Sequence, residues 1–192
     1  DALPAYPASS PWVTAVGGTQ LVRGAGGTIA TERAWSDEAS GTSSGGGTSG
    51  YAASPAWQRT AGIDGKQRRY PDVSSLAAVD RVNSIPRCRA GGCTWVQIGG
   101  TSATAPTLAG DLAVALSASR AAGGAVRAGW LGPSIAAWAT DADGPIADVT
   151  EGSTALGDRT CCGAERGFDL ATGFGSMVGW DQIAADLARH RG

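Results

Sequence analysis

The sequence predicts an α/β fold built around a parallel sheet with helices packed on it. Two observations predict this fold: short apolar segments that read as buried strands, and stretches with apolar residues at helical spacing that follow them. Strands that alternate with helices usually form parallel sheets covered by helices. A chain of 192 residues is also long enough to bury a core of its own. We therefore expect residues 1–192 to belong to one domain.

Four elements are expected in chain order. Residues 12–16 are an apolar run that stops at two glycines and reads as a strand, and residues 94–98 form a second strand. Both strands are expected to be buried and parallel. Residues 106–116 read as a largely buried helix, and residues 180–189 as a terminal amphipathic helix.

Ser102 stands between the second expected strand and the helix, in the sequence Gly-Gly-Thr-Ser-Ala-Thr-Ala-Pro. The two glycines permit a tight turn, so the pattern is typical of a displayed nucleophile. The backbone N–H of Ser102 would lie at the positive end of a helix dipole and could serve an oxyanion hole. The alternative interpretation is a serine that only caps the helix.

A serine nucleophile needs a positioned base, and the chain offers few. His190 is the one histidine and lies in a basic tail, while Lys66 is the one lysine and lies in a polar turn. A histidine-based triad within this chain is therefore not expected. The base must be a carboxylate or a residue of another polypeptide.

Composition excludes several classes of function. The formal net charge of −2 and the 17% of charged residues do not indicate a nucleic-acid partner. No apolar run is long enough for a membrane span. The sequence starts with neither an initiating methionine nor a signal peptide. We expect a processed piece of a longer, secreted, extracellular precursor.

Four cysteines agree with an extracellular location. Cys88 and Cys93 flank a short flexible loop and are expected to form a local disulfide. Cys161 and Cys162 are adjacent, and either a vicinal disulfide or a partner elsewhere fits the sequence. Zinc is discounted because neither pair has CxxC spacing.

Several motifs together resemble the sedolisin family of serine-carboxyl peptidases. They run in family order from near residue 6 to near residue 180: residues 6–19, 44–49 and 70–74, the Ser102 turn, and residues 148–150 and 167–175. A subtilisin-like protease shares the Gly-Thr-Ser helix but typically has Met-Ala after the serine, where this chain has Ala103 and Thr104. The motif at residues 44–47 also favours an ordered loop in the glycine-rich segment 41–50.

The resemblance implies a subtilisin-like fold and an acid-acting peptidase that forms an acyl-enzyme on Ser102. In the family, the glutamate base, the aspartate that orients it and the oxyanion-hole aspartate all precede the segment at residue 6. This chain would then be the C-terminal half of the catalytic domain. We expect the N-terminal half, as a separate chain, to complete the sheet, because half a sheet would expose strand edges and apolar faces. Endopeptidase activity is the default and tripeptidyl-peptidase activity the variant.

The same resemblance implies a single calcium site in the region of about residues 148–175. Its ligands would be the side chains of Asp148 and Asp169 with the backbone carbonyls of Val149, Glu165 and Gly167. Glu165 stands where the family commonly has a glycine. The alternative is that both aspartates only hold turns.

Two further alternatives stay open. The chain can be a catalytically silent calcium-binding fragment or binding module, or half of a subtilisin-like protease whose histidine base lies on the other chain. For the remaining residues we expect structural roles: Asp72 bonding turn amides, and Arg68 and Arg69 solvated at the surface. The tryptophans at positions 35, 57 and 95 are expected to be buried, and the alternative is that they line substrate subsites.

Overall fold

The computed structural model describes residues 5–78, 83–124, 127–157 and 161–189. Its strands are β1 (Val16–Arg23), β2 (Ile29–Ala34), β3 (Ser36–Asp37), β4 (Thr42–Ser43), β5 (Gly47–Ala53), β6 (Gln67–Tyr70), β7 (Val73–Leu76), β8 (Asn83–Arg89), β9 (Gly92–Ile98), β10 (Ile146–Ala147) and β11 (Ser176–Met177). Its helices are α1 (Ala56–Thr60), α2 (Thr101–Ala121), α3 (Gly132–Thr140) and α4 (Trp180–Arg189), with a 3-10 turn at Ala25–Gly27. No helix in these ranges is both long and apolar enough for a membrane span.

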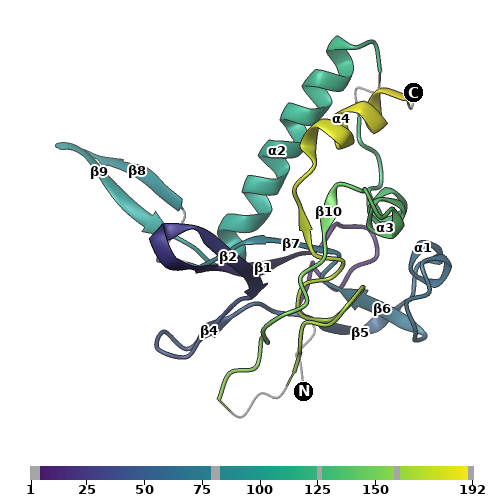
Figure 1. Cartoon of the computed structure of the whole chain (residues 1–192), viewed down its shortest axis with the longest axis horizontal. Helices are drawn as coiled ribbons and strands as arrows, with labels where there is room; N and C mark the ends of the chain where they lie inside the picture. The colour runs from purple at the N-terminus through teal and green to yellow at the C-terminus, as the bar shows by residue number, and fades with distance from the viewer. Residues whose placement is uncertain (1–4, 79–82, 125–126, 158–160, 190–192) are drawn as a thin grey trace.

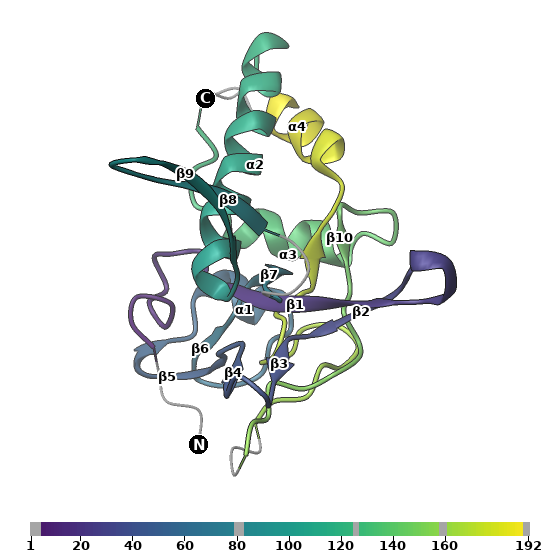
Figure 2. The same cartoon turned by 90° about the vertical axis from the view of Figure 1, so that its left-hand side faces the viewer.

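A five-stranded mixed sheet in the order β10-β11-β7-β1-β2 forms the centre of the molecule. The central strand β7 runs parallel to β1 and to β11, while β1 with β2 and β10 with β11 are antiparallel. Helices α2 and α4 lie together on one side of the sheet, and the pairs β3–β4 and β5–β6 lie on the other (Figures 1 and 2). The expected parallel sheet is therefore present in the three central strands.

Strand β1 corrects the first expected strand. It begins where residues 12–16 were expected to end, and it continues through Gly17 and Gly18. A Cβ atom at Gly17 would lie 2.5 Å from Ser74 Oγ, and one at Gly18 would lie 2.6 Å from Ala77 Cβ. The glycines thus let β7 and the segment after it approach β1 closely, instead of ending the strand.

Strand β9 corrects the second expectation. It is not buried and parallel but forms an antiparallel hairpin with β8, which projects from the body of the molecule (Figure 1). Trp95 on this hairpin is 73% exposed, so its expected burial is wrong, whereas Trp35 and Trp57 are buried. The expected Cys88–Cys93 disulfide joins the two strands near the hairpin tip.

Helix α2 is longer than the expected helix and starts at Thr101, before the nucleophile. It packs mainly against α4, β1 and β7. Leu108 and Ala115 are buried, but Val114 is 70% exposed, so the expectation of a largely buried helix is wrong and the helix is only half covered. Helix α4 has the bounds that the sequence predicts.

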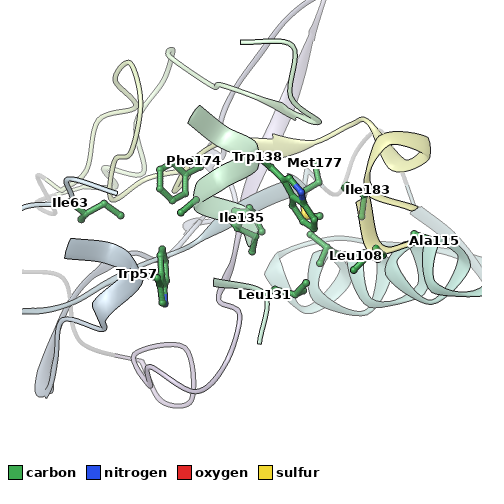
Figure 3. Close-up of a cluster of buried hydrophobic side chains, with 13 residues drawn as sticks. Trp57, Ile63, Leu108, Ala115, Leu131, Ile135, Trp138, Phe174, Met177 and Ile183 are labelled. Atoms are coloured by element: carbon green, nitrogen blue, oxygen red, sulfur yellow. The ribbon is translucent and has the colours of Figure 1, made fainter. Parts of the chain in front are cut away.

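The main hydrophobic core joins all four helices to the central strands (Figure 3). Its side chains come from α1, α2, α3, α4, β7 and β11, and include Trp57, Leu108, Ile135, Trp138, Met177 and Ile183. Burial of these large apolar groups fixes the position of α2 relative to the sheet. The start of α2, which carries Ser102, is thereby held on the sheet.

Candidate active site

The turn before α2 places Ser102 at the second position of the helix. Gly100 makes this turn with φ 80° and ψ 171°, a conformation that is essentially restricted to glycine. The N–H of Gly100 donates to the carbonyl of Ala77 at 2.6 Å, and its own carbonyl accepts from the N–H of Ala103 at 2.9 Å. These two bonds tie the turn to the end of β7 and to the first turn of the helix.

The side chain of Trp35 packs between this turn and β1. It is 5% exposed. A Cβ atom at Gly18 would lie 3.1 Å from Trp35 Cε3 and 3.5 Å from Thr101 Cγ2, and one at Gly100 would lie 3.7 Å from Trp35 Cη2. The indole therefore fills the space between β1 and the nucleophile turn. The sequence does not predict this contact, because nothing in it links Trp35 to a residue so far along the chain.

Ser102 is exposed and free to meet a substrate. Neither its hydroxyl nor its N–H has a hydrogen-bond partner among the residues that the structure describes. The N–H points from a helix start, where it carries partial positive charge and suits an oxyanion. In this part of the chain no carboxylate, imidazole or amine is bonded to the hydroxyl, and His190 lies outside the described residues.

The two predicted calcium-binding aspartates meet at one short segment. Asp148 Oδ2 accepts from the N–H of Gly167 at 2.8 Å, and Asp169 Oδ2 accepts from the N–H of Glu165 at 2.8 Å. Asp169 Oδ1 also accepts from the N–H of Thr172 at 2.7 Å. The structure thus brings the predicted residues together in the segment between β10 and β11, whose yellow-green trace lies at the opposite end of the view from α2 in Figure 1.

Burial raises the pKa of the Asp169 carboxyl, and the N–H donors of Glu165, Thr172 and Ala171 oppose that shift. The Val149 carbonyl lies close by, where it accepts from the Thr172 hydroxyl at 3.4 Å. No described residue other than glycine has a positive φ, so Glu165 takes the usual glycine position without backbone strain.

The donor set fits calcium, which prefers carboxylate and carbonyl oxygens. In the described ranges no three side chains of His, Cys, Asp or Glu gather around one point. A cation here would depend on two carboxylates and on carbonyls, as the predicted ligand set does.

Cys161 and Cys162 are joined to each other, which settles the open pairing as a vicinal disulfide. Thr154 binds the pair through its backbone and side chain: its N–H donates to the Cys162 carbonyl at 2.9 Å, and its hydroxyl accepts from the Cys162 N–H at 3.0 Å. The disulfide therefore lies in the loop that connects Asp148 to Asp169.

Arg68 corrects another expectation, since it is fully buried and not solvated. Its guanidinium forms two bonds with the Asp72 carboxylate, at 2.5 and 2.6 Å. Asp72 Oδ2 also accepts from the N–H of Ala15 at 2.8 Å. Asp72 thus has a structural role, as expected, but its partners are the Arg68 guanidinium and the distant Ala15 amide and not the amides of its own turn. It fixes the start of β1 beside the start of β7.

No family model matches the chain, but individual relatives do. Kumamolisin from Bacillus sp. (strain MN-32) is 35% identical over 182 residues, which cover 91% of this chain and 31% of that protein. Sedolisin from Pseudomonas sp. (strain 101) is 31% identical over 90% of this chain and 28% of its own length. The solved structure of Pseudomonas sedolisin, a serine-carboxyl proteinase in complex with two molecules of pseudo-iodotyrostatin, superposes with a TM-score of 0.77 at 29% identity. The chain belongs to the sedolisin family.

The match to the solved sedolisin covers 96% of this chain and 48% of that chain. The chain also spans about a third of the length of the curated sedolisins that it matches. The expected subtilisin-like α/β fold, present in part, agrees with this coverage. Sequence motifs indicated two parts of the candidate site, the Ser102 turn and the loop that carries Asp148 and Asp169. They did not indicate the contact of Trp35 with the Ser102 turn.

Proposed function

We propose that this chain supplies the nucleophile of a serine-carboxyl peptidase. The observation that carries the proposal is the exposed Ser102 in a Gly-Gly-Thr-Ser turn at the start of α2, in a chain of the sedolisin family. One relative, from Aspergillus fumigatus, is named tripeptidyl-peptidase sed5, and is 32% identical over 91% of this chain and 32% of its own length. Peptide or protein substrates are the class that fits.

In the proposed reaction Ser102 Oγ attacks the carbonyl carbon of a peptide bond while its proton passes to a base. The carbonyl oxygen becomes an oxyanion, to which the Ser102 N–H donates. Collapse of this intermediate breaks the C–N bond while the base returns its proton to the leaving nitrogen, so that the amine is released and an ester remains on Ser102. Water then hydrolyses the ester. Endopeptidase cleavage remains the default mode.

The base, its orienting partner and an acid for the oxyanion would come from a companion chain that carries the other half of the domain. Two observations support a companion. Ser102 has no basic partner in the described ranges. Between residues 105 and 118 the exposed residues of α2 also include a single charged one, and they are Ala105, Pro106, Thr107, Ala109, Gly110, Asp111, Ala113, Val114, Ser117 and Ala118. Exposed, largely apolar faces of this kind mark contact surfaces.

We also assign the calcium site to the side chains of Asp148 and Asp169 and the carbonyls of Val149, Glu165 and Gly167. A bound calcium ion would neutralise the two carboxylates and link both ends of the loop. A carboxylate base and a protonated acid fit activity in acid, and the disulfides fit a secreted enzyme released from a precursor.

The first test is covalent labelling of Ser102 with a fluorophosphonate probe, followed by peptide mass spectrometry. The purified protein is labelled in acidic and in neutral buffer, together with any companion that native mass spectrometry detects. We expect an adduct on Ser102 in acid, none in Ser102→Ala, and full labelling in the control Ser40→Ala, because Ser40 lies in an exposed loop.

Two results would contradict the proposal in different ways. A folded protein that binds calcium and a companion chain but never labels would support the silent binding module. Labelling that rises toward neutral pH and fades in acid would support a subtilisin-like half with a histidine base on the companion chain.

A further inference from the structure

A groove of about 580 Å³ lies beside the nucleophile turn. Its walls come from three places in the fold: β1 and β2, the segment 35–37 that follows β2, and the base of β9 with the end of the β7 segment. In Figure 1 the β1–β2 ribbon and the β8–β9 hairpin both extend from the left of the body, and Figure 2, turned by 90°, shows them pointing away from each other. The groove lies between these two ribbons, because its lining includes residues of β1 and β2 on one side and of β9 on the other.

Trp35 connects this groove to Ser102. The same indole lines the groove and lies within 4 Å of the Cβ positions that Gly18 and Gly100 would have. Gln97 lines the opposite wall and belongs to β9, the strand that leads into the Ser102 turn. Trp35 and Gln97 are thus the two lining residues that connect the groove to the Ser102 turn.

Arg33 is the positioned cation of the groove. In the β1–β2 ladder it lies directly opposite Gln20. With the Gln20 amide oxygen facing the guanidinium, that oxygen accepts from Arg33 Nη2 at 2.7 Å and from Nε at 2.6 Å. Since a guanidinium has five donors, the remaining N–H groups of Arg33 are available to a ligand.

The other charged residues that line the groove are less suited than Arg33 to bind a ligand. Arg23, farther out on the ribbon, donates to the Gly27 carbonyl at 3.3 Å. Asp37 accepts from the Ser40 hydroxyl at 2.6 Å and from the N–H of Ala39 at 3.0 Å, so its carboxylate is engaged within its own turn. The described lining thus has two cations against one anion, and Arg33 is the cation that a partner side chain holds in place.

We propose that this groove binds the part of a peptide substrate next to the cleaved bond and selects a carboxylate there through Arg33. The inference rests on the proposed peptidase function for the identity of the ligand. The carboxylate can be an Asp or Glu side chain or the C-terminus of a short peptide, because a guanidinium binds both in the same way. Arg33 is thus a specificity-determining residue.

The test compares the binding of three peptides to the intact protein at about pH 6, where glutamate is ionised. They are acetyl-Ala-Ala-Glu-Ala-amide, its glutamine counterpart, and the glutamine peptide with a free C-terminus. Binding is followed by NMR through the indole N–H of Trp35. We expect the glutamate peptide to bind about fivefold more tightly than its neutral counterpart, the size typical of a solvent-accessible ion pair. A gain for the free C-terminus alone would assign the groove to peptide ends instead of side chains.

Arg33→Gln should abolish the preference, Arg33→Lys should keep part of it, and the control Arg120→Gln should keep all of it, because Arg120 lies in the last turn of α2 and outside the groove. Equal binding of all peptides, no binding, or a preference that survives in Arg33→Gln would overturn the inference. Fluorophosphonate labelling of the same samples separates the two proposals. Labelling without a carboxylate preference defeats only the groove assignment, while a preference without any labelling defeats only the peptidase function.

Discussion

Gly100 is the residue on which the display of Ser102 depends most directly. Its backbone lies in a region that costs other residues about 1–3 kcal/mol. A Cβ atom at this position would lie in ordinary contact with Trp35, 3.7 Å from Cη2. The turn is therefore both strained for any other residue and packed against a rigid indole.

We expect Gly100→Ala to lower the free energy of unfolding by about 1–3 kcal/mol and to slow labelling of Ser102 by the fluorophosphonate. Gly110→Ala is the matched control, since Gly110 lies inside α2 with open space around it. There the same change should raise stability by up to about 1 kcal/mol. Urea unfolding and labelling rates measure both effects, and equal results for the two variants would contradict the role of Gly100.

Asp72 gives a second prediction at this scale. Asp72→Asn leaves the buried Arg68 guanidinium without a counter-charge, so we expect a loss of about 3–5 kcal/mol in unfolding free energy. Arg189→Ala removes an exposed pair with Asp186 and should cost about 1 kcal/mol or less. Thermal and urea unfolding compare them. A loss below about 1 kcal/mol for Asp72→Asn would show that the buried pair does not hold β1 to β7.

The sequence indicated some of these residues and not others for a physical reason. Ser102, Asp148 and Asp169 lie in local motifs whose chemistry depends on near neighbours in the chain. Arg68 looked like half of a surface pair because its counter-charge and its burial depend on how β1, β6 and β7 meet. Trp35 was expected to be buried, but its support of the Ser102 turn is a contact between distant segments.

Among the elements, the loop that carries Asp148 and Asp169 predicts a pH dependence. Burial raises the pKa of Asp169 in the folded protein, so the folded state holds that proton more tightly than the unfolded state. Without metal, its contribution to stability is fully present below the unfolded pKa and is lost as pH rises through the folded pKa. Calcium reverses the sign, because it binds the ionised carboxylate and its binding strengthens as pH rises.

The measurement is urea unfolding of the natural protein and of Asp169→Asn, in chelator and in calcium, from acid to neutral pH. In chelator the advantage of the natural protein over the variant should shrink as pH rises, and in calcium it should grow. Identical pH profiles with and without calcium would remove Asp169 from the ligand set.

Elements differ in how far the sequence could specify them. Helix α4 agrees with its prediction because its apolar spacing is regular and one face is buried. The predicted strand at residues 94–98 is present in β9. Its apolar pattern, however, does not reveal whether the strand lies in the central sheet or in an exposed hairpin. The two glycines in β1 look like the end of a strand in the sequence. Glycine is required there only because β7 and the segment after it pack closely against β1, which the sequence does not show.

At the scale of the whole molecule, the half-covered helix α2 predicts how a companion chain assembles. Val114→Glu places a charge in the middle of its exposed, largely apolar face. We expect the change to leave the stability of the isolated chain within about 0.5 kcal/mol, as for most surface substitutions, and to prevent association with the companion.

Val178→Glu is the control, because Val178 is similarly exposed but lies after β11 and not on α2. With Val178→Glu, native mass spectrometry should detect the complex and Ser102 should be labelled in acidic buffer. With Val114→Glu, we expect neither the complex nor the label. Normal assembly of both variants would place the companion on another surface.

The central sheet also sets the time at which the protein can fold. Strand β7 pairs with β1 from the beginning of the chain and with β11 from near its end. During synthesis the N-terminus leaves the ribosome first, so the sheet can be completed only after Met177 has emerged. Until then β7 keeps an unpaired edge, and contacts between such distant residues form slowly. Newly made chains would thus depend on chaperones or on covalently attached neighbouring segments during synthesis.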